Sequence, residues 1–497
     1  MHQASLTVDP AFRVGEVDPR LYGSFVEHMG RCVYTGIYEP EHPSADANGF
    51  RQDVTALVRE LGVPLVRYPG GNFVSGYRWE DGIGPVAERP RRLDLAWRSL
   101  ETNRVGVNEF MTWAKSAGVA PMMAVNLGTR GIDAARSLVE YCNLPGGTYW
   151  SDLRGGDPYA IKTWCLGNEM DGPWQTGHKT AYEYARLALE TAKAMRQVDP
   201  SIELVACGSS NRAMPTFGSW EATVLGEAYD AVDYVSMHAY YQQHGDDRDS
   251  FLAVATDMDG FIDDVIATAD HARAVGRHKK RINISFDEWN VWYQSRFVGE
   301  TNLEIEETPR LIEDVYSVTD AVVVGNLLIS LLRHADRVKI GCLAQLVNVI
   351  APIMTEPNGQ VWRQASFHPF ALTAAHGQGT VLQVVADSPV VETKAFGAVP
   401  ILDSVAVQTS SGVVIFAVNR SQDTPLSLDV DLRSLPGLTT ASHTALFDSD
   451  PDAINTAAAP DRVAPRSLDD AKLDGGRLQA VLPPLSWNML RLTGNGS

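Results

Sequence analysis

The sequence contains few cysteines and no long hydrophobic run. Its five cysteines are scattered along the chain and odd in number, so we expect small buried residues rather than a disulfide framework or a metal site. No apolar stretch approaches the length of a membrane span. The first ten residues also lack the basic and then apolar pattern of a secretory signal. These absences predict a cytoplasmic protein with no membrane partner.

Positive charge is also in short supply. The 42 Lys and Arg residues are outnumbered by 61 Asp and Glu residues, which gives a formal net charge of -19 at pH 7. A surface of this sign repels phosphates, which argues against a nucleic-acid partner and favours a neutral ligand. The chain has no HExxH, no paired CxxC, no GxGxxG after a strand and no Walker loop. We therefore expect neither a metal nor a nucleotide cofactor.

The chain is long enough for two domains, one of them large. In residues 18–380, short apolar strands alternate with amphipathic helices. We expect strands at residues 21–27, 64–68, 121–126, 161–166, 202–207, 232–237, 282–286 and 340–346. We expect helices at residues 50–61, 107–117, 132–141, 179–198, 258–275, 310–335 (one long helix or a pair) and 369–376. This alternation predicts an α/β fold, a (β/α)8 barrel, with a doubly wound open sheet as the alternative.

From about residue 381 the helical period disappears. Short strands separated by Ser, Gly, Asp and Pro are expected at residues 381–385, 405–408, 413–418 and 426–430. This pattern predicts an all-β sandwich over residues 381–497. Residues 1–17 alternate in polarity and are interrupted by Asp9 and Pro10. We expect them to form a small strand pair that joins the sandwich.

Two of the predicted strands deliver a glutamate into a polar and aromatic surrounding. The fourth strand is followed by Gly-Asn-Glu, which ends at Glu169, and the seventh by Asp-Glu-Trp-Asn, in which the glutamate is Glu288. The carboxyl ends of barrel strands form the active-site face, so we expect the two glutamates to face each other. Two carboxyl groups across one bond suit the hydrolysis of a glycosidic bond. The alternative for each is a solvated or ion-paired side chain.

Amides, further acids and indoles lie at or near the other strand ends. They are Glu27, Arg67, Asn72, Trp97, Asn126, Asn168, Trp174, Ser209, Ser210, Asn211, His238, Tyr240, Trp289, Trp292, Gln345 and Asn348. Amides and carboxylates hydrogen-bond hydroxyls, and indoles cover the apolar face of a sugar ring, so the set predicts a hydroxyl-rich ligand. Three members have structural alternatives: His238 as a satisfied core histidine, Asn72 as a turn residue, and Arg67 as a counter-ion of Glu288.

Six motifs occur in order along the chain. They are GSFVEH (23–28), RYPGGNF (67–73), GNEMDG (167–172), HAYY (238–241), DEWNVWY (287–293) and AQLVNVIAP (344–352). In this combination the sequence resembles the family-51 glycoside hydrolases, the intracellular α-L-arabinofuranosidases. The resemblance covers nearly the whole chain. It implies a (β/α)8 barrel with a β-sandwich, a retaining mechanism, no metal, and a homo-oligomer that is often a hexamer.

The resemblance also implies a role for each site residue. Glu169 is implied as the general acid/base and Glu288 as the nucleophile, which Arg67 and a hydrogen bond from Tyr240 would keep ionised. The residues implied to bind the arabinosyl group are Glu27, Asn72, Asn168, His238, Tyr240, Trp292 and Gln345. Trp97 and Trp174 are implied to pack against the leaving group.

We therefore predict an exo-acting, retaining α-L-arabinofuranosidase that removes terminal arabinofuranosyl groups from arabinose-containing oligosaccharides. One alternative is the same chemistry on β-xylosides or β-glucans, which a panel of nitrophenyl glycosides would separate. The other is a barrel that binds sugar without hydrolysing it, which ligand binding without turnover would support.

Overall fold

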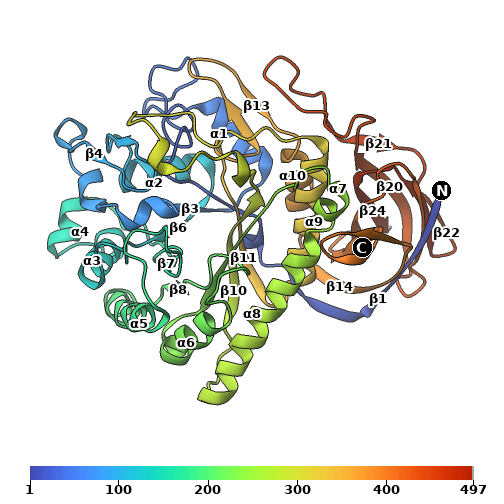
Figure 1. The fold of residues 1–497 in the computed structure, drawn as a ribbon, viewed down its shortest axis with the longest axis horizontal. Coiled ribbons are helices and arrows are strands. Elements are labelled where there is room, and N and C mark those ends of the chain that lie inside the picture. The colour runs from blue at the N-terminus through green and yellow to red at the C-terminus, as the bar shows by residue number, and fades with distance from the viewer. Residues whose placement is uncertain (495–497) are drawn as a thin grey trace.

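Eight parallel strands form a closed barrel in the computed structural model, which describes residues 1–494 (Figure 1). In barrel order they are β2 (Gly23–Phe25), β3 (Leu65–Tyr68), β6 (Ala120–Ala124), β7 (Thr163–Leu166), β8 (Glu203–Ala206), β9 (Tyr234–Tyr241), β10 (Asn283–Val291) and β11 (Val338–Leu343). Strand β11 pairs with β2, so the sheet has no free edge. The predicted (β/α)8 barrel is confirmed, and the open doubly wound sheet is wrong.

Helices surround the barrel, and most of them bury an apolar stripe (Figure 1). They are α1 (Gln52–Leu61), α2 (Val107–Ala117), α3 (Ile132–Asn143), α4 (Tyr149–Arg154), α5 (Ala181–Val198), α6 (Ser219–Ala228), α7 (Arg248–Leu252), α8 (Ala255–Gly276), α9 (Val318–Arg333) and α10 (Phe367–His376). In α5 the buried residues Tyr184, Ala188 and Met195 recur at helical spacing. This helix begins after Thr180, because the Thr180 hydroxyl accepts from the Glu183 N–H while the Glu183 carboxylate accepts from the Thr180 N–H.

Two helical segments differ from the prediction. The segment 310–335, predicted as one long helix or a pair, is helical only as α9, because Ser317 caps its first turn and the residues before it are irregular. Helix α6 lies between β8 and β9, where no helix is predicted. Its exposed side carries Ala222 and Gly226 opposite the buried Trp220 and Leu225. Small residues on the exposed side weaken the polar contrast by which a helix is recognised.

The second part of the chain is a ten-stranded sheet in the order β21-β20-β24-β18-β17-β14-β1-β19-β23-β22. Its strands are β1 (His2–Glu16), β14 (Thr380–Asp387), β17 (Leu402–Thr409), β18 (Gly412–Asn419), β19 (Leu426–Asp431), β20 (Leu438–Leu446), β21 (Arg466–Leu468), β22 (Lys472–Asp474), β23 (Arg477–Leu482) and β24 (Ser486–Gly494). Apolar residues of β19 and β23 share a core with those of β17, β18 and β24. The predicted C-terminal all-β domain is confirmed, and its two layers are halves of one curled sheet.

The N-terminal residues join this β domain as one strand rather than as the predicted pair. Strand β1 is antiparallel to β14 and parallel to β19. Its register against β14 shifts between Val8 and Arg13, the interval that contains Pro10. Proline cannot donate to a ladder, so it is accommodated in the irregular part of a strand that continues on both sides. Three small hairpins complete the fold: β4 (Arg92–Leu93) with β5 (Leu100–Glu101), β12 (Ile353–Thr355) with β13 (Val361–Arg363), and β15 (Val390–Thr393) with β16 (Gly397–Pro400).

Helix α9 lies between the barrel and the β domain and is buried from Val318 to Leu332 (Figure 1). Its Gly325 faces the fully buried Trp487 of β24. A Cβ at this glycine would lie 2.2 Å from Cδ1 of the indole. The absence of a side chain at Gly325 therefore sets how closely the helix and the sheet approach each other.

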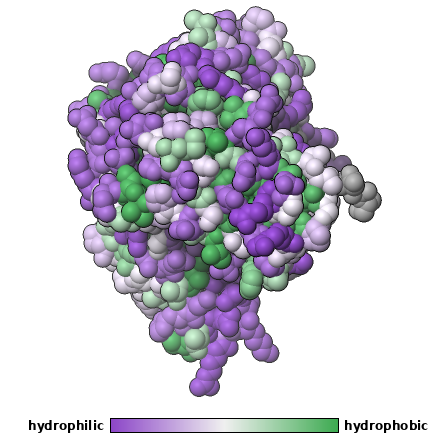
Figure 2. All heavy atoms as spheres, turned by 90° about the vertical axis from the view of Figure 1, so that its right-hand side faces the viewer, coloured by the Kyte–Doolittle hydropathy of each residue, from purple (hydrophilic) through white to green (hydrophobic). Residues whose placement is uncertain are grey.

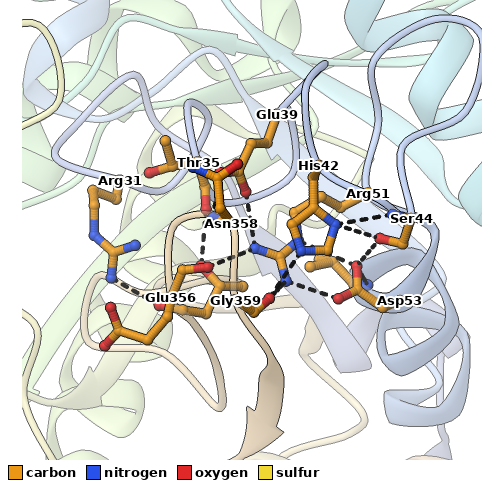
Figure 3. A network of polar contacts seen from close by, with 12 residues as sticks. Arg31, Thr35, Glu39, His42, Ser44, Arg51, Asp53, Glu356, Asn358 and Gly359 are labelled. Atoms are coloured by element: carbon orange, nitrogen blue, oxygen red, sulfur yellow. Dashed lines mark hydrogen bonds and ion pairs between the residues drawn. The ribbon is translucent and has the colours of Figure 1, made fainter.

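A buried arginine fixes the long segment between β2 and α1 (Figure 3). The Arg51 guanidinium donates to the carboxylates of Glu39 and Asp53 and to the backbone carbonyls of Glu356 and Gly359. Both carbonyls belong to the turn between β12 and β13. A charge taken out of water requires such partners. The segment that follows β2 is therefore held against this hairpin.

The face of the molecule that carries the β domain is mainly hydrophilic, with apolar residues interspersed (Figure 2). Among residues 1–494, no helix combines the length and the apolar character that crossing a lipid bilayer requires. All five cysteines are buried and free. The prediction that they are small buried residues is confirmed.

We expect Gly325→Ala to lower the midpoint of thermal unfolding, followed by circular dichroism. Alanine favours a helix over glycine by about 1 kcal/mol. The new methyl group would, however, overlap the rigid Trp487 ring, and overpacking of a core costs about 1–3 kcal/mol. The clash should therefore outweigh the gain in helix propensity.

The matched control is Gly226→Ala in α6. No heavy atom lies within 4 Å of the place where its Cβ would be, so only the propensity gain of about 1 kcal/mol remains and the midpoint should rise. A stabilising effect of Gly325→Ala would contradict the close approach of α9 and β24.

Candidate active site

A cavity of about 1000 Å³ opens at the carboxyl ends of the barrel strands. Nine of the twelve residues predicted for the site line it: Glu27, Asn72, Trp97, Glu169, Trp174, Tyr240, Glu288, Trp292 and Gln345. The other three, Arg67, Asn168 and His238, hydrogen-bond to residues that line it. The barrel therefore brings the whole predicted set together.

Two asparagines and an indole from the strand ends lie elsewhere. Asn126 donates to the Tyr77 carbonyl, and its own oxygen accepts the N–H of Thr129, so it fixes neighbouring loops. Asn348 donates to the Arg31 carbonyl. Trp289 is fully buried in the core. Side chains at strand ends thus serve loop structure as well as the cavity.

An extra residue in β10 turns two consecutive acids towards the barrel interior. Ser285 pairs with Ser236 of β9, but Glu288, three residues further on, pairs with His238, only two residues further on. Neighbours in a regular strand point to opposite faces, whereas a bulge breaks this alternation. Accordingly Asp287 lies 3.2 Å from Nε2 of His238, and Glu288 lies 3.6 Å from Nδ1 of the same ring.

Glu288 is held from both sides of its carboxylate. Nη1 of Arg67 donates to Oε1 at 2.6 Å, and the Tyr240 hydroxyl donates to Oε2 at 2.7 Å. Burial and the charge of Glu288 raise the pKa of Tyr240 well above its usual value, so the phenol remains a donor. Arg67 also donates to Oδ1 of Asn168 at 2.7 Å. Charge-assisted bonds of this kind stabilise and orient the carboxylate.

Glu169 follows β7 with a left-handed backbone, at a φ of 44°, which is uncommon for a residue with a side chain. Its Oε1 accepts from Nδ1 of His238 at 2.9 Å, and its Oε2 accepts from Nε1 of Trp174 at 2.7 Å. One carboxylate oxygen of Glu169 lies within 4.8 Å of one of Glu288. The two glutamates therefore face each other across a gap that one reacting atom can fill.

His238 is a cation between the acids. Burial alone would lower its pKa, but the charge of Glu288 and the hydrogen bonds to Asp287 and Glu169 outweigh burial and raise the pKa to about 10. Asp287 is fully buried and also accepts from the Ser236 hydroxyl at 2.5 Å. Ser236 thus positions Asp287, one of the acids that keep His238 charged, and it is a site residue that the sequence pattern did not predict. The Asp-Glu doublet was the available signal, but the bulge that turns both acids inward was not visible.

Glu27 is a further acid in the cavity. Its carboxyl group accepts from the Phe73 N–H and from Nε1 of Trp97, both at 2.9 Å, and from Nε2 of Gln345 at 3.2 Å. Burial, reinforced by the charge of Glu288, raises the pKa of Glu27 to about 8. Near neutral pH this group therefore carries a proton that it can donate to a ligand hydroxyl.

The double glycine after β3 leaves room for these acids. A Cβ at Gly71 would lie 3.0 Å from Oε1 of Glu288 and 3.3 Å from Oε2 of Glu27. A Cβ at Gly70 would lie 2.7 Å from Cγ of Glu27. Side chains here would displace both carboxyl groups. The next residue, Asn72, lines the cavity, and its Oδ1 accepts from Nδ2 of Asn168 at 3.3 Å.

The charges around the glutamate pair favour an organic ligand over a cation. Glu169, His238 and Glu288 each offer an atom within 4.8 Å of the others, a spacing that a metal ion could bridge. A protonated His238 has no free lone pair for a metal. Arg67 already neutralises Glu288 at 2.6 Å. A metal ion would have to displace two positive groups.

Two family models match most of the chain between them. The model described as "Alpha-L-arabinofuranosidase 1 domain" matches residues 57–259, and the one described as "Alpha-L-arabinofuranosidase C-terminal domain" matches residues 287–486.

Individual proteins match over the whole chain. The chain is 60% identical over 499 residues to the intracellular exo-α-(1→5)-L-arabinofuranosidase of Streptomyces lividans, covering 99% of this chain and 75% of that protein. It is 51% identical over 509 residues to the exo-α-(1→6)-L-arabinofuranosidase of Bifidobacterium longum, covering 99% of this chain and 98% of that protein. A solved family 51 α-L-arabinofuranosidase from Bifidobacterium longum is 48% identical, with a TM-score of 0.95 and 99% coverage of both chains.

We expect neutron diffraction at pH 8 to show deuterium on both ring nitrogens of His238, because its pKa is raised to about 10. His368 is an internal control in the same crystal, since burial and the nearby Arg363 lower its pKa to about 4 and it should carry one deuterium. A single deuterium on His238 would contradict the account of the acids around it. The pKa of His238 is higher in the folded state than its value near 6.5 in the unfolded chain. The protonated ring therefore stabilises the folded state fully below pH 6.5, and this contribution is lost as the pH rises through 10.

Proposed function

This chain belongs to the family 51 α-L-arabinofuranosidases, and we propose that it is a retaining, exo-acting hydrolase of terminal α-L-arabinofuranosyl groups. The observation that carries the proposal is the pair Glu169 and Glu288, which place one carboxylate oxygen each within 4.8 Å. Retaining glycosidases hold their carboxyl groups about 5–5.5 Å apart, and inverting enzymes about 6.5–9.5 Å apart. The short separation supports a retaining double displacement.

In the first step Glu288 acts as the nucleophile. Its carboxylate attacks the anomeric carbon, while the bond between that carbon and the leaving-group oxygen breaks. Glu169 donates its proton to this oxygen, so the leaving alcohol departs neutral. Arg67 and Tyr240 orient the attacking carboxylate through the hydrogen bonds at 2.6 and 2.7 Å. The product is an ester between Glu288 and the arabinosyl group.

In the second step Glu169 acts as the base. It takes a proton from a water molecule, whose oxygen attacks the anomeric carbon and releases Glu288 as a carboxylate. Two inversions restore the original configuration. His238 hydrogen-bonds to Oε1 of Glu169 at 2.9 Å and so orients this carboxyl group in both steps.

The remaining cavity residues bind the sugar. We assign the arabinosyl group to Glu27, Asn72, Asn168, His238, Tyr240, Trp292 and Gln345. Trp292 packs edge-on against Tyr240, with ring centroids 5.2 Å apart, and gives this end an apolar wall. Trp174 is 48% exposed and bonded to Glu169, which suits contact with the leaving group. Trp97 instead bonds to Glu27, which favours contact with the arabinosyl group over the predicted contact with the leaving group.

Substrate, location and assembly extend the proposal. We propose arabino-oligosaccharides as substrates, with the (1→5) linkage named for the Streptomyces relative and the (1→6) linkage named for the Bifidobacterium relative as the two to compare. An intracellular location follows the name of the first relative. We also propose a homo-oligomer, for which the resemblance implies a hexamer. The proposed domains are residues 18–380, and residues 1–17 together with 381–497.

Azide rescue of two variants tests the catalytic roles. We expect Glu288→Ala to lower kcat/KM by at least about 10⁴-fold, because the covalent step is lost. With p-nitrophenyl α-L-arabinofuranoside and azide it should form the β-arabinosyl azide. Glu169→Ala should lower kcat/KM on an oligosaccharide by about 10²–10⁴-fold but spare the activated p-nitrophenyl substrate, which needs no proton. It should form the α-azide.

NMR of the azide products reads the anomeric configuration. Glu190→Ala, which removes a partly exposed glutamate from α5, is the control and should behave as wild type. An α-azide from Glu288→Ala, or equal damage by Glu169→Ala on both substrates, would overturn the assigned roles.

A substrate panel tests the sugar and the mode of attack. We expect turnover of p-nitrophenyl α-L-arabinofuranoside and little of the β-xyloside or β-glucoside. From linear arabino-oligosaccharides, chromatography should detect arabinose and a chain shortened by one unit at the earliest times. Preference for the β-xyloside would keep the catalytic roles of the two glutamates and replace arabinose with xylose as the proposed substrate sugar. If the protein bound these glycosides but hydrolysed none of them, the proposed hydrolase activity would be wrong.

A further inference from the structure

The cavity continues from the catalytic pair over the rim of the barrel. Tyr240 and Tyr241 are neighbours in β9 and point to opposite faces of the strand, yet both line the cavity. Tyr240 donates to Glu288 inside the barrel, whereas Tyr241 donates to Asp257 of α8, outside it, at 3.2 Å. The cavity therefore reaches from the catalytic glutamates to the surrounding helices.

This extension lies beside Glu169. In the turn that carries Glu169, Asp171 accepts from the Ser210 N–H at 3.1 Å and from the Ser210 hydroxyl. Ser210 begins the segment 210–213, which lines the cavity. A general acid protonates the leaving-group oxygen, so the leaving group lies on the side of Glu169. The extension is placed to receive that group.

Polar side chains along this extension fix one another. Arg212 donates to Asp257 at 3.1 Å and to Asp264 at 2.8 Å, while Tyr241 donates to the other oxygen of Asp257. The Arg212 side chain is 37% exposed, and its five N–H groups exceed the bonds that these carboxylates accept. A charge-paired wall with donors to spare suits neutral hydroxyls better than an anionic ligand.

An apolar part of the wall comes from the β domain. The turn between β15 and β16 carries Phe396, which is half-buried and lines the cavity together with Phe251 of α7. The Ala395 N–H donates to the Ser250 hydroxyl of α7 at 3.1 Å and so holds this hairpin against the barrel. Aromatic rings beside hydrogen-bonding groups match the two kinds of surface that a sugar ring presents.

We propose that this outer lobe, defined by Arg212, Tyr241, Phe251, Asp257 and Phe396, binds the second sugar unit of an oligosaccharide leaving group. The inference rests on the proposed function. The sugar ring packs on Phe396, and its hydroxyls hydrogen-bond with Arg212 and Asp257. The ligand class is a neutral oligosaccharide of at least three units, with one unit at the catalytic end and two in the leaving group. Phe396 and Arg212 thereby determine the preference for chain length.

The test compares kcat/KM for p-nitrophenyl α-L-arabinofuranoside with that for the di- and trisaccharide of whichever arabinosyl linkage, (1→5) or (1→6), the wild type hydrolyses. The wild type should prefer the trisaccharide over the disaccharide by about 3- to 10-fold, the worth of a ring contact. Phe396→Ala and Arg212→Gln should each remove most of this preference and change the p-nitrophenyl rate less than about twofold, since that substrate does not reach the lobe.

Two control variants match the chemistry of the changes. Arg186→Gln removes another arginine that pairs with two carboxylates, those of Glu190 and Glu227, and Phe12→Ala removes an aromatic that is 61% exposed on β1. Neither residue lines the cavity, so both variants should keep the trisaccharide preference.

Three outcomes would overturn the outer lobe as a sugar site: no trisaccharide preference in the wild type, a preference kept by both variants, or equal losses on all three substrates. The last would mean that these residues position the catalytic pair instead. The absence of all arabinoside turnover by the folded wild type would overturn the proposed function itself. Turnover of the p-nitrophenyl substrate without a preference for length would overturn the lobe alone.

Discussion

Negative charge gathered at the carboxyl ends of the barrel strands is the constraint on which the site depends. Asp287, Glu288 and Glu169 are compensated by Arg67 and His238. Removing an ion from water costs several kcal/mol unless partners replace the solvent. The two cations come from β3 and β9, and the three acids come from β10 and the turn after β7. The carboxyl ends of these strands converge only in the closed barrel. Loss of either cation would leave the three acids with a single positive partner, so the fold and the charge balance of the site are maintained together.

Regular strands alone would not bring these groups together. The bulge in β10 turns Asp287 and Glu288 to one side, and the left-handed backbone at Glu169 directs its carboxyl group at the same gap. Gly71 lets the chain pass where a Cβ would lie 3.0 Å from Glu288. Each of these local irregularities carries a conformational cost that the surrounding packing must offset. They occur where the chemistry requires a side chain to leave its regular direction.

The contrast between regular strands and irregular backbone also explains how much of this structure the sequence predicts. The barrel and the glutamates were predictable, because apolar strands alternate with helices and Glu169 and Glu288 each follow such a strand. The charge of His238 was not predictable, because it depends on Glu288 and Asp287 both facing inward, and the bulge that turns them has no signal in the residue pattern. The helix expected over residues 310–335 begins only after Ser317. Apolar residues lie on both sides of Ser317 and suggest one continuous helix, but the Ser317 side chain caps the first turn and so sets the start. Residue types located the site, and irregular backbone determined its geometry.

The β domain takes part in the arrangement of the cavity as well as in the stability of the fold. Its hairpin places Phe396 in the cavity wall, and the bond from Ala395 to Ser250 fixes that hairpin to α7. The position of the whole domain depends on α9, which is buried against it where Gly325 meets Trp487. A shift of this interface would move the hairpin relative to Glu169. Packing far from the reacting bond therefore influences which leaving groups fit, because one wall of the cavity is built on a separate sheet.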